Sequence, residues 1–176
     1  MPLRDAAFHA FFEEHYAELS RLAYLMTGET AVADDLAADA LTEVWQHWER
    51  VTATRDPAAY ARGIVANLTR NWVRRQGRAR RYLRLLDLPG RDQQRAQPDV
   101  PAVLDVRSAL RRMPHRRRAC LVLRYAFDLS EREVAEILDI SVGAVKSQTS
   151  RGARQLAEML QDVRLADHLD GWEVAR

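Results

Sequence analysis

The sequence lacks the features that define several large classes of protein. Its 176 residues include a single cysteine, Cys120, which excludes an internal disulfide framework and a zinc site built on cysteines. No run of about 18 apolar residues is present to cross a membrane, and no apolar run follows the first residues, as a secretory signal would require. We therefore expect a soluble, cytoplasmic protein.

Motifs typical of catalytic sites are also absent from the sequence. The sequence has no glycine-rich phosphate loop and no nucleophile motif. Glu43 and His47 lie four positions apart on a predicted helix, whereas di-metal helical bundles use glutamate followed by histidine three positions later on two helices. We expect neither an enzyme nor a bound metal or cofactor.

Charge is unevenly distributed, although the net charge is only +2. Residues 1–56 contain four arginines and eleven acids, residues 57–86 contain eight arginines and no acid, and residues 106–124 contain seven arginines and no acid. Two purely basic blocks suggest two places where the chain contacts a polyanion. Solvated helix faces are the alternative, but such faces usually mix both signs.

Apolar residues recur at three- and four-residue steps and predict helices throughout. In the first half the helices are expected over residues 8–26, over residues 30–48 and from Pro57 onward, where Asp56 is a candidate cap and proline occupies the first helical position. From residue 86 to 101 the pattern stops among three prolines, a glycine and polar residues. This composition predicts an extended linker and a domain boundary.

Helical periodicity resumes after the linker and leads to a helix-turn-helix. Helices are expected over residues 103–113 and 116–127. Ser130 and Glu133 then form a capping box, and a tight turn ends at Ser141, which caps a second helix. Ala135 is small where the two helices approach each other, and Val145 can hold the second helix against the first.

The second helix of this motif carries small and basic residues on its outer face. A helix of this kind enters the major groove by its N-terminal end, where side chains reach base edges and phosphates. A helical hairpin that binds no DNA is the alternative, but the caps, turn, core spacing and basic face agree with DNA binding. The candidate contacts are Ser141, Gly143, Ala144, Lys146, Ser147, Gln148, Ser150, Arg151 and Arg154.

Three segments together resemble bacterial sigma factors of the sigma-70 family. Residues 129–156 resemble region 4, residues 34–45 resemble region 2.2 and residues 57–75 resemble regions 2.3 and 2.4. The resemblance runs from about Phe8 to Leu160 and is closest to the compact extracytoplasmic-function (ECF) group, group 4. It implies an all-α fold with two small domains, a three-to-four-helix bundle (1–85) and a helix-turn-helix domain (102–162), joined by the linker (86–101) and followed by a tail (163–176).

The resemblance implies that the helix-turn-helix reads the −35 promoter element and that the first domain opens and reads the −10 element. Basic residues, amides and a loop at residues 50–56 suit a separated strand with a flipped base. Tyr60 and Trp72 also continue an apolar face, so a place in the core is the alternative, and partial burial is the alternative for Asn67. The candidates at the −10 element are Tyr60, Asn67, Arg70, Asn71, Arg74 and Arg75.

The resemblance also implies core RNA polymerase as a partner, through its β′ clamp helices and its β flap, with promoter DNA and an anti-sigma factor. The candidates for polymerase binding are Asp35, Leu36, Asp39 and Glu43, acids beside an apolar spot that suit a partner helix rich in arginine. Ala38-Asp39 departs from the usual glutamine–glutamate pair of the family but keeps the acid. A solvated acidic face is the alternative, and a helix-turn-helix regulator acting without polymerase is the runner-up function.

Overall fold

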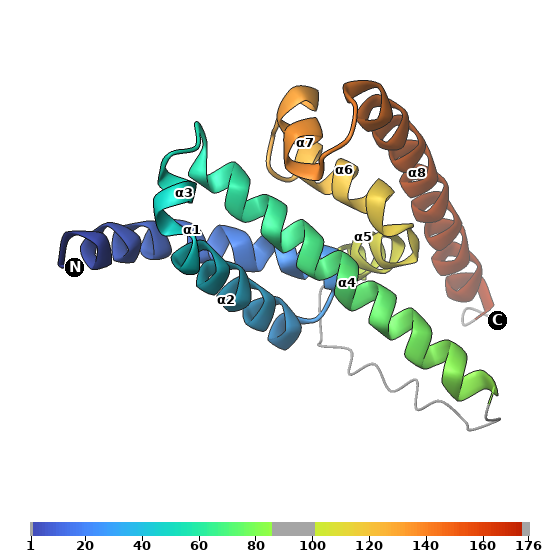
Figure 1. Ribbon diagram of the computed structural model, residues 1–176. Helices are drawn as coiled ribbons and strands as arrows, with labels where there is room; N and C mark the ends of the chain where they lie inside the picture. Colours follow the sequence, from blue (N-terminus) through green and yellow to red (C-terminus); the bar gives the residue numbers. More distant parts are fainter. Residues whose placement is uncertain (1, 86–100, 174–176) are drawn as a thin grey trace.

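The computed structural model describes residues 2–85 and 101–173, which form eight helices without a strand (Figure 1). The first unit contains α1 (Pro2–Thr27), α2 (Thr30–Gln46), α3 (Trp48–Thr52) and α4 (Pro57–Leu85). The second unit contains α5 (Pro101–Arg112), α6 (His115–Tyr125), α7 (Glu131–Leu138) and α8 (Val142–Glu173). The predicted all-α class is confirmed.

Small residues allow the helices of the first unit to pack closely. α2 buries Ala33, Ala37 and Ala40, and it lies against both α1 and α4. Small side chains on one face let two neighbouring helix axes approach each other. α1 contributes larger apolar residues such as Leu22 and Met26, which are almost fully buried. α1 ends at Thr27 and is followed by Gly28, whose φ of +78° favours glycine.

The predicted second helix, residues 30–48, is divided into two. α2 ends at Gln46, and His47 has φ −113° and ψ 23°, outside the helical range. This break turns Trp48 inward, where its ring meets the rings of Phe8 and Phe11 at centroid distances of 5.4 and 5.5 Å. Burial of this large aromatic ring outweighs continuation of the helix, a tertiary effect that periodicity does not reveal.

α6 is the central helix of the second unit. It buries every residue from Arg118 to Leu123 and packs against α8. α8 is longer than expected, because the segment predicted as a tail, 163–176, is helical as far as Glu173. The predicted linker, 86–101, lies outside the described residues except for Pro101, which begins α5.

The two units pack against each other. α4 crosses the middle of the molecule, with α1 and α2 on one side and the helices of the second unit on the other (Figure 1). α4 contacts α7 and α6, and α1 contacts α5 and α6. A single cluster of buried residues therefore extends from Leu22 through Val65 to Leu123 and Val145. Among the described helices, none has the length and apolarity to cross a membrane.

Candidate nucleic-acid interface

The helix-turn-helix has the local geometry that its sequence predicts. The main-chain N–H of Ser130 donates to the Glu133 carboxylate at 2.6 Å, and the N–H of Glu133 donates to the Ser130 hydroxyl at 3.2 Å. Hydrogen bonds from the side chain and the main chain of Ser130 to the Glu133 carboxylate lower the pKa of this carboxyl. α7 ends at Asp139, which adopts the left-handed conformation with φ 50°, and the hydroxyl of Ser141 accepts from the N–H of Ala144 at 3.1 Å.

Burial separates the inner and outer faces of α8. Val145 is fully buried and Thr149 nearly so, which fixes the helix on α7 and α6. Of the nine predicted DNA contacts, Ala144 and Gln148 are half-buried. The other seven are exposed together on the opposite face: Ser141, Gly143, Lys146, Ser147, Ser150, Arg151 and Arg154.

Two of these side chains already have partners within the protein. The Lys146 ammonium lies 3.6 Å from the Glu131 carboxylate at the start of α7. This exposed ion pair is weak, so a phosphate can displace it. The Ser147 hydroxyl donates to the Ala144 carbonyl at 3.0 Å, which leaves its oxygen lone pairs as acceptors.

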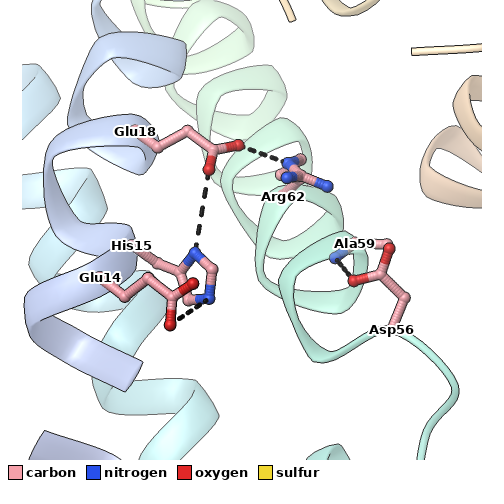
Figure 2. Close-up of polar contacts among 6 residues, drawn as sticks. All are labelled: Glu14, His15, Glu18, Asp56, Ala59 and Arg62. Carbon is pink, nitrogen blue, oxygen red and sulfur yellow. Dashed lines mark hydrogen bonds and ion pairs between the residues drawn. The ribbon is translucent and has the colours of Figure 1, made fainter. Parts of the chain in front are cut away.

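α4 is fixed at its start by a cap and by an ion pair with α1 (Figure 2). The Asp56 carboxylate accepts from the N–H of Ala59 at 2.8 Å, as predicted. Nε of Arg62 donates to Glu18 at 2.6 Å, and the same carboxylate lies 3.8 Å from the ring of His15. Arg62, although it belongs to the first basic block, therefore holds α4 on α1 and does not face solvent as a free cation.

Beyond Arg62, α4 exposes a stripe of polar and basic side chains. Asn67 is exposed, so the alternative of partial burial does not apply to it. Arg70, Asn71, Arg74 and Arg75 are exposed as well. Trp72 is half-buried and not part of the inner core.

Tyr60 combines two environments. Its ring is half-buried against the core cluster, while its hydroxyl accepts from the Arg50 guanidinium at 2.7 Å. Arg50 belongs to α3, so the predicted loop at residues 50–56 is partly helical. Residues 53–56 alone form the turn into α4.

A groove of about 770 Å³ lies between the start of α4 and α7. Its α4 wall includes Tyr60 and Asn67, and its α7 wall includes Arg132, Glu133 and Glu136. Two predicted contacts of the −10 element therefore face the helix-turn-helix unit. No sequence signal indicated this juxtaposition, because it depends on how the two units pack.

The second basic block, residues 106–124, is used largely for packing. Arg118 is only 4% exposed and donates to the carbonyls of Met26, Arg111 and Met113. Arg117 donates to Gln155 at 2.6 Å, and Arg124 donates to the Leu129 carbonyl. The prediction that this block contacts a polyanion is therefore wrong for these three arginines.

Three of the four predicted polymerase-binding residues lie together on α2. Asp35 and Asp39 are exposed, one helical turn apart, and Leu36 is half-buried beside them. Glu43 is half-buried and lines the groove between α4 and α7. The structure therefore keeps the first three together and directs Glu43 toward the second unit.

Comparisons with known proteins agree with this arrangement. The family models "Sigma-70 region 2" and "Sigma-70, region 4" match residues 11–79 and 104–156. The ECF RNA polymerase sigma factor SigL of Mycobacterium tuberculosis is 32% identical over 164 residues, 90% of this chain and 91% of the relative. The chain belongs to the ECF family of RNA polymerase sigma factors.

Two further proteins are similar to this sigma factor, one in sequence and one in fold. SigW of Bacillus subtilis is 26% identical over 171 residues, covering 89% of this chain and 90% of the relative. The structure of the sigma factor RpoE of Bartonella quintana, solved with the anti-sigma factor NepR, superposes with a TM-score of 0.72 at 22% identity. That match covers 88% of this chain and 97% of RpoE.

As a sigma factor, the chain directs RNA polymerase to promoters, and the predicted function is confirmed. A regulator that acts without polymerase is not favoured. The two matched regions correspond to the two structural units, so the basic stripe of α4 lies in region 2 and the helix-turn-helix in region 4.

The sigma factor also has an apolar groove that sequence reasoning missed. It measures about 450 Å³ and is bounded by α5, α6 and α8, with Leu25 of α1 at one edge. Tyr125 stands in this groove with 68% of its surface exposed. Its other lining residues include Val106, Leu110, Leu121, Leu156 and Leu160.

Proposed function

We propose that the outer face of α8 reads the −35 element. The observation that supports this most is the separation of α8 into a buried face, with Val145 and Thr149, and an exposed face with small residues at its N-terminal end and arginines farther along. Gly143 has no side chain of its own, and a Cβ there would meet only the Ser141 hydroxyl, at 4.0 Å, so the helix end can approach base edges closely. Lys146, Arg151 and Arg154 would contact phosphates, and Ser147 and Gln148 would contact bases.

The exposed stripe of α4 is proposed to hold the separated strand at the −10 element. Asn67 and Asn71 supply amides that pair with base edges, and Arg70, Arg74 and Arg75 supply charge for phosphates. Tyr60, half-buried near the start of the helix, lines the same groove as Thr54 and Asp56 of the preceding turn. The stripe has no competing acid on its own helix, because residues 57–86 contain none.

Polymerase would bind at two surfaces. Asp35, Leu36 and Asp39 on α2 suit the β′ clamp helices, with Glu43 at the margin of the surface. The apolar groove around Tyr125 suits an apolar segment such as the β flap. An anti-sigma factor is a further proposed partner, supported by the NepR complex of the structurally similar RpoE. We propose that the chain has no catalytic activity and that it acts in the cytoplasm.

Run-off transcription with reconstituted holoenzyme tests these assignments. Lys146→Ala with Arg151→Ala is expected to lower promoter-specific transcripts by about tenfold or more, since each lost DNA contact costs about 1–3 kcal/mol, while core polymerase still binds. Asp35→Asn with Asp39→Asn is expected to weaken capture of core polymerase. The matched controls are Arg116→Ala and Glu13→Gln, exposed residues of α6 and α1 outside these surfaces. Equal effects of controls and test variants would refute the assignments.

A further inference from the structure

Two arginines of the second basic block are not used for packing. Arg111 and Arg112 occupy the last turn of α5, where Arg111 is half-buried and Arg112 is exposed. Within residues 2–85 and 101–173, neither guanidinium has a carbonyl or carboxylate partner. Both side chains line one groove, so two cations without internal partners meet at the same cavity.

This basic groove lies between the two units. It measures about 610 Å³, within the usual size of a site for a small molecule. None of the described residues that line it is acidic. Its two long walls are formed by Trp72, Gln76 and Gly77 of α4 and by Ser108, Arg111 and Arg112 of α5.

A third arginine, Arg118 of α6, closes the groove from within. Its guanidinium donates to the carbonyl of Met26 and to the carbonyls of Arg111 and Met113, at 2.8 and 3.1 Å. Only carbonyl dipoles therefore oppose its charge among the described residues. Burial and the nearby charge of Arg111 lower the pKa of Arg118 to about 10, and a bound anion would reverse that effect.

The α5 wall is suited to phosphate. The stem of Arg111 passes directly over Gly28, since a Cβ atom at Gly28 would lie 2.6 Å from Cδ of Arg111. This contact holds Arg111 at the groove. Ser108, one helical turn before Arg112, adds an exposed hydroxyl to the same wall. Guanidinium groups bind phosphate oxygens with paired hydrogen bonds, and a hydroxyl can donate a further one.

The α4 wall is fixed on the second unit at two points. Nε2 of His115 lies 3.0 Å from the hydroxyl of Thr69, which is fully buried. The Thr69 hydroxyl donates its proton to the Ala66 carbonyl at 3.0 Å, so the imidazole N–H is the donor to Thr69. Closer to the start of α4, a Cβ atom at Gly63 would lie 3.3 Å from the carbonyl oxygen of Ile137. Fixed walls reduce the entropy lost when a ligand binds.

The α4 wall is suited to a flat ring. Trp72 and Val73 are half-buried there. A Cβ atom at Gly77 would have no atom within 4 Å, so the space beside Trp72 is open. Indole rings are surfaces on which bases stack, and the Gln76 amide can both donate to and accept from a base edge. An inorganic anion would use the arginines and leave this wall unused.

We propose that the basic groove binds a nucleoside diphosphate or triphosphate. Its phosphates would contact Arg111 and Arg112, with the charge of Arg118 behind them, and its base would lie against Trp72. None of the residues proposed for the −35 or −10 element lines this groove, so the proposal does not depend on those assignments. Because both units line the groove, the ligand contacts both and stabilises the folded chain by mass action.

Calorimetric titration of the full chain at physiological ionic strength tests the proposal. The probes are GTP, ATP, pyrophosphate and guanosine. At least one nucleotide is expected to bind more tightly than pyrophosphate and guanosine, because only a nucleotide uses both walls. The midpoint of thermal unfolding should rise with the concentration of that nucleotide.

Two variants test the location of the site. Arg112→Gln removes an exposed charge and should weaken both nucleotide and pyrophosphate about tenfold, the factor for one charge-assisted hydrogen bond. Gly77→Leu fills the open space beside Trp72 and should abolish nucleotide binding, while the midpoint of unfolding is kept or raised, since leucine favours a helix more than glycine does. The matched controls are Arg116→Gln on α6 and Ala17→Leu on α1, exposed positions outside the groove.

Trp72→Leu tests the contact with the base. It should weaken the nucleotide about fivefold or more, the range for loss of base stacking, and leave the affinity for pyrophosphate unchanged. An equal loss for both probes would show that Trp72 only shapes the groove, and would overturn the base contact.

Three results would overturn the proposal as a whole. The first is the absence of binding by GTP and ATP, and the second is an equal loss of affinity in test and control variants. The third is nucleotide binding only after Asp87→Asn, Asp92→Asn and Asp99→Asn. That result would show that acids of the segment between α4 and α5 occupy the groove in the native chain.

Discussion

Neighbouring arginines on α6 have different roles, and burial decides which. Arg116 is exposed, Arg117 is half-buried and bonded to Gln155, and Arg118 is buried with three carbonyl acceptors. Burial and the nearby Arg111 lower the pKa of Arg118 to about 10, so it remains charged at neutral pH. The carbonyl oxygens at two helix ends compensate this buried charge. Three consecutive arginines therefore lie in three different environments, which the sequence alone does not distinguish.

His115 is expected to make the stability of the folded chain depend on pH. Burial, and then the charges of Arg118, Arg70 and Arg74, lower its pKa from 6.5 to about 4. The folded chain therefore keeps the imidazole neutral, whereas the unfolded chain takes up a proton near pH 6.5. Stability is fully present above that pH and is lost progressively as the pH falls from about 6.5 toward 4.

Urea unfolding of the wild type and of His115→Gln at pH 7.5 and 5.5 measures this effect. The glutamine keeps an N–H donor for Thr69 but does not titrate in this range. The wild type should lose more stability than the variant between the two pH values, and the other histidines cancel in the comparison. An equal loss in both proteins would show that His115 does not titrate differently in the folded chain.

At the scale of elements, α4 carries separate functions on its two sides. Its inner side places Val65 and Thr69 in the core, and Arg62 joins it to α1. Its outer side carries the stripe proposed for the −10 strand. Ile64 is buried on the inner side. The half-burial of Trp72 depends on α5, because Arg111 and Arg112 of that helix line the same groove as Trp72.

The capping box of α7 is expected to support the recognition helix that follows it. Ser130→Ala removes the hydroxyl that accepts from Glu133 and should lower the free energy of unfolding by about 1 kcal/mol. Because α7 positions α8, binding to a −35 duplex by holoenzyme should weaken as well. Urea unfolding measures the first effect and a duplex competition assay the second. Ser150→Ala, on the exposed face of α8, is the control for stability, and a similar loss there would exclude a specific role of the cap.

At the scale of the whole molecule, the two regions share one continuous core. The described chain is therefore expected to unfold in a single transition, with a van 't Hoff enthalpy equal to the calorimetric enthalpy. The double variant Thr69→Val/Gly63→Leu changes residues where α4 contacts α6 and α7, and it leaves the helix caps and turns of both units unchanged. It should broaden this transition or divide it into two. Two separate transitions in the wild type would contradict strong coupling between the units.

Much of this sigma factor is determined locally by its sequence. The capping box at Ser130, the cap at Asp56, the glycine end of α1 and the face of α8 around Val145 all depend on residues within one or two helical turns, and each was predictable for that reason. The two regions and their order along the chain were implied by the resemblance that three sequence segments bear to sigma factors.

Only the tertiary structure shows how the two units contact each other. Whether Arg118 contacts nucleic acid or the end of α1 depends on packing between residues 92 positions apart, and so does the meeting of Gly63 with Ile137. Such contacts arise from the shapes of whole faces, which no local period encodes. The helix-turn-helix and the basic stripe of α4 were visible in the sequence, whereas their mutual docking was not.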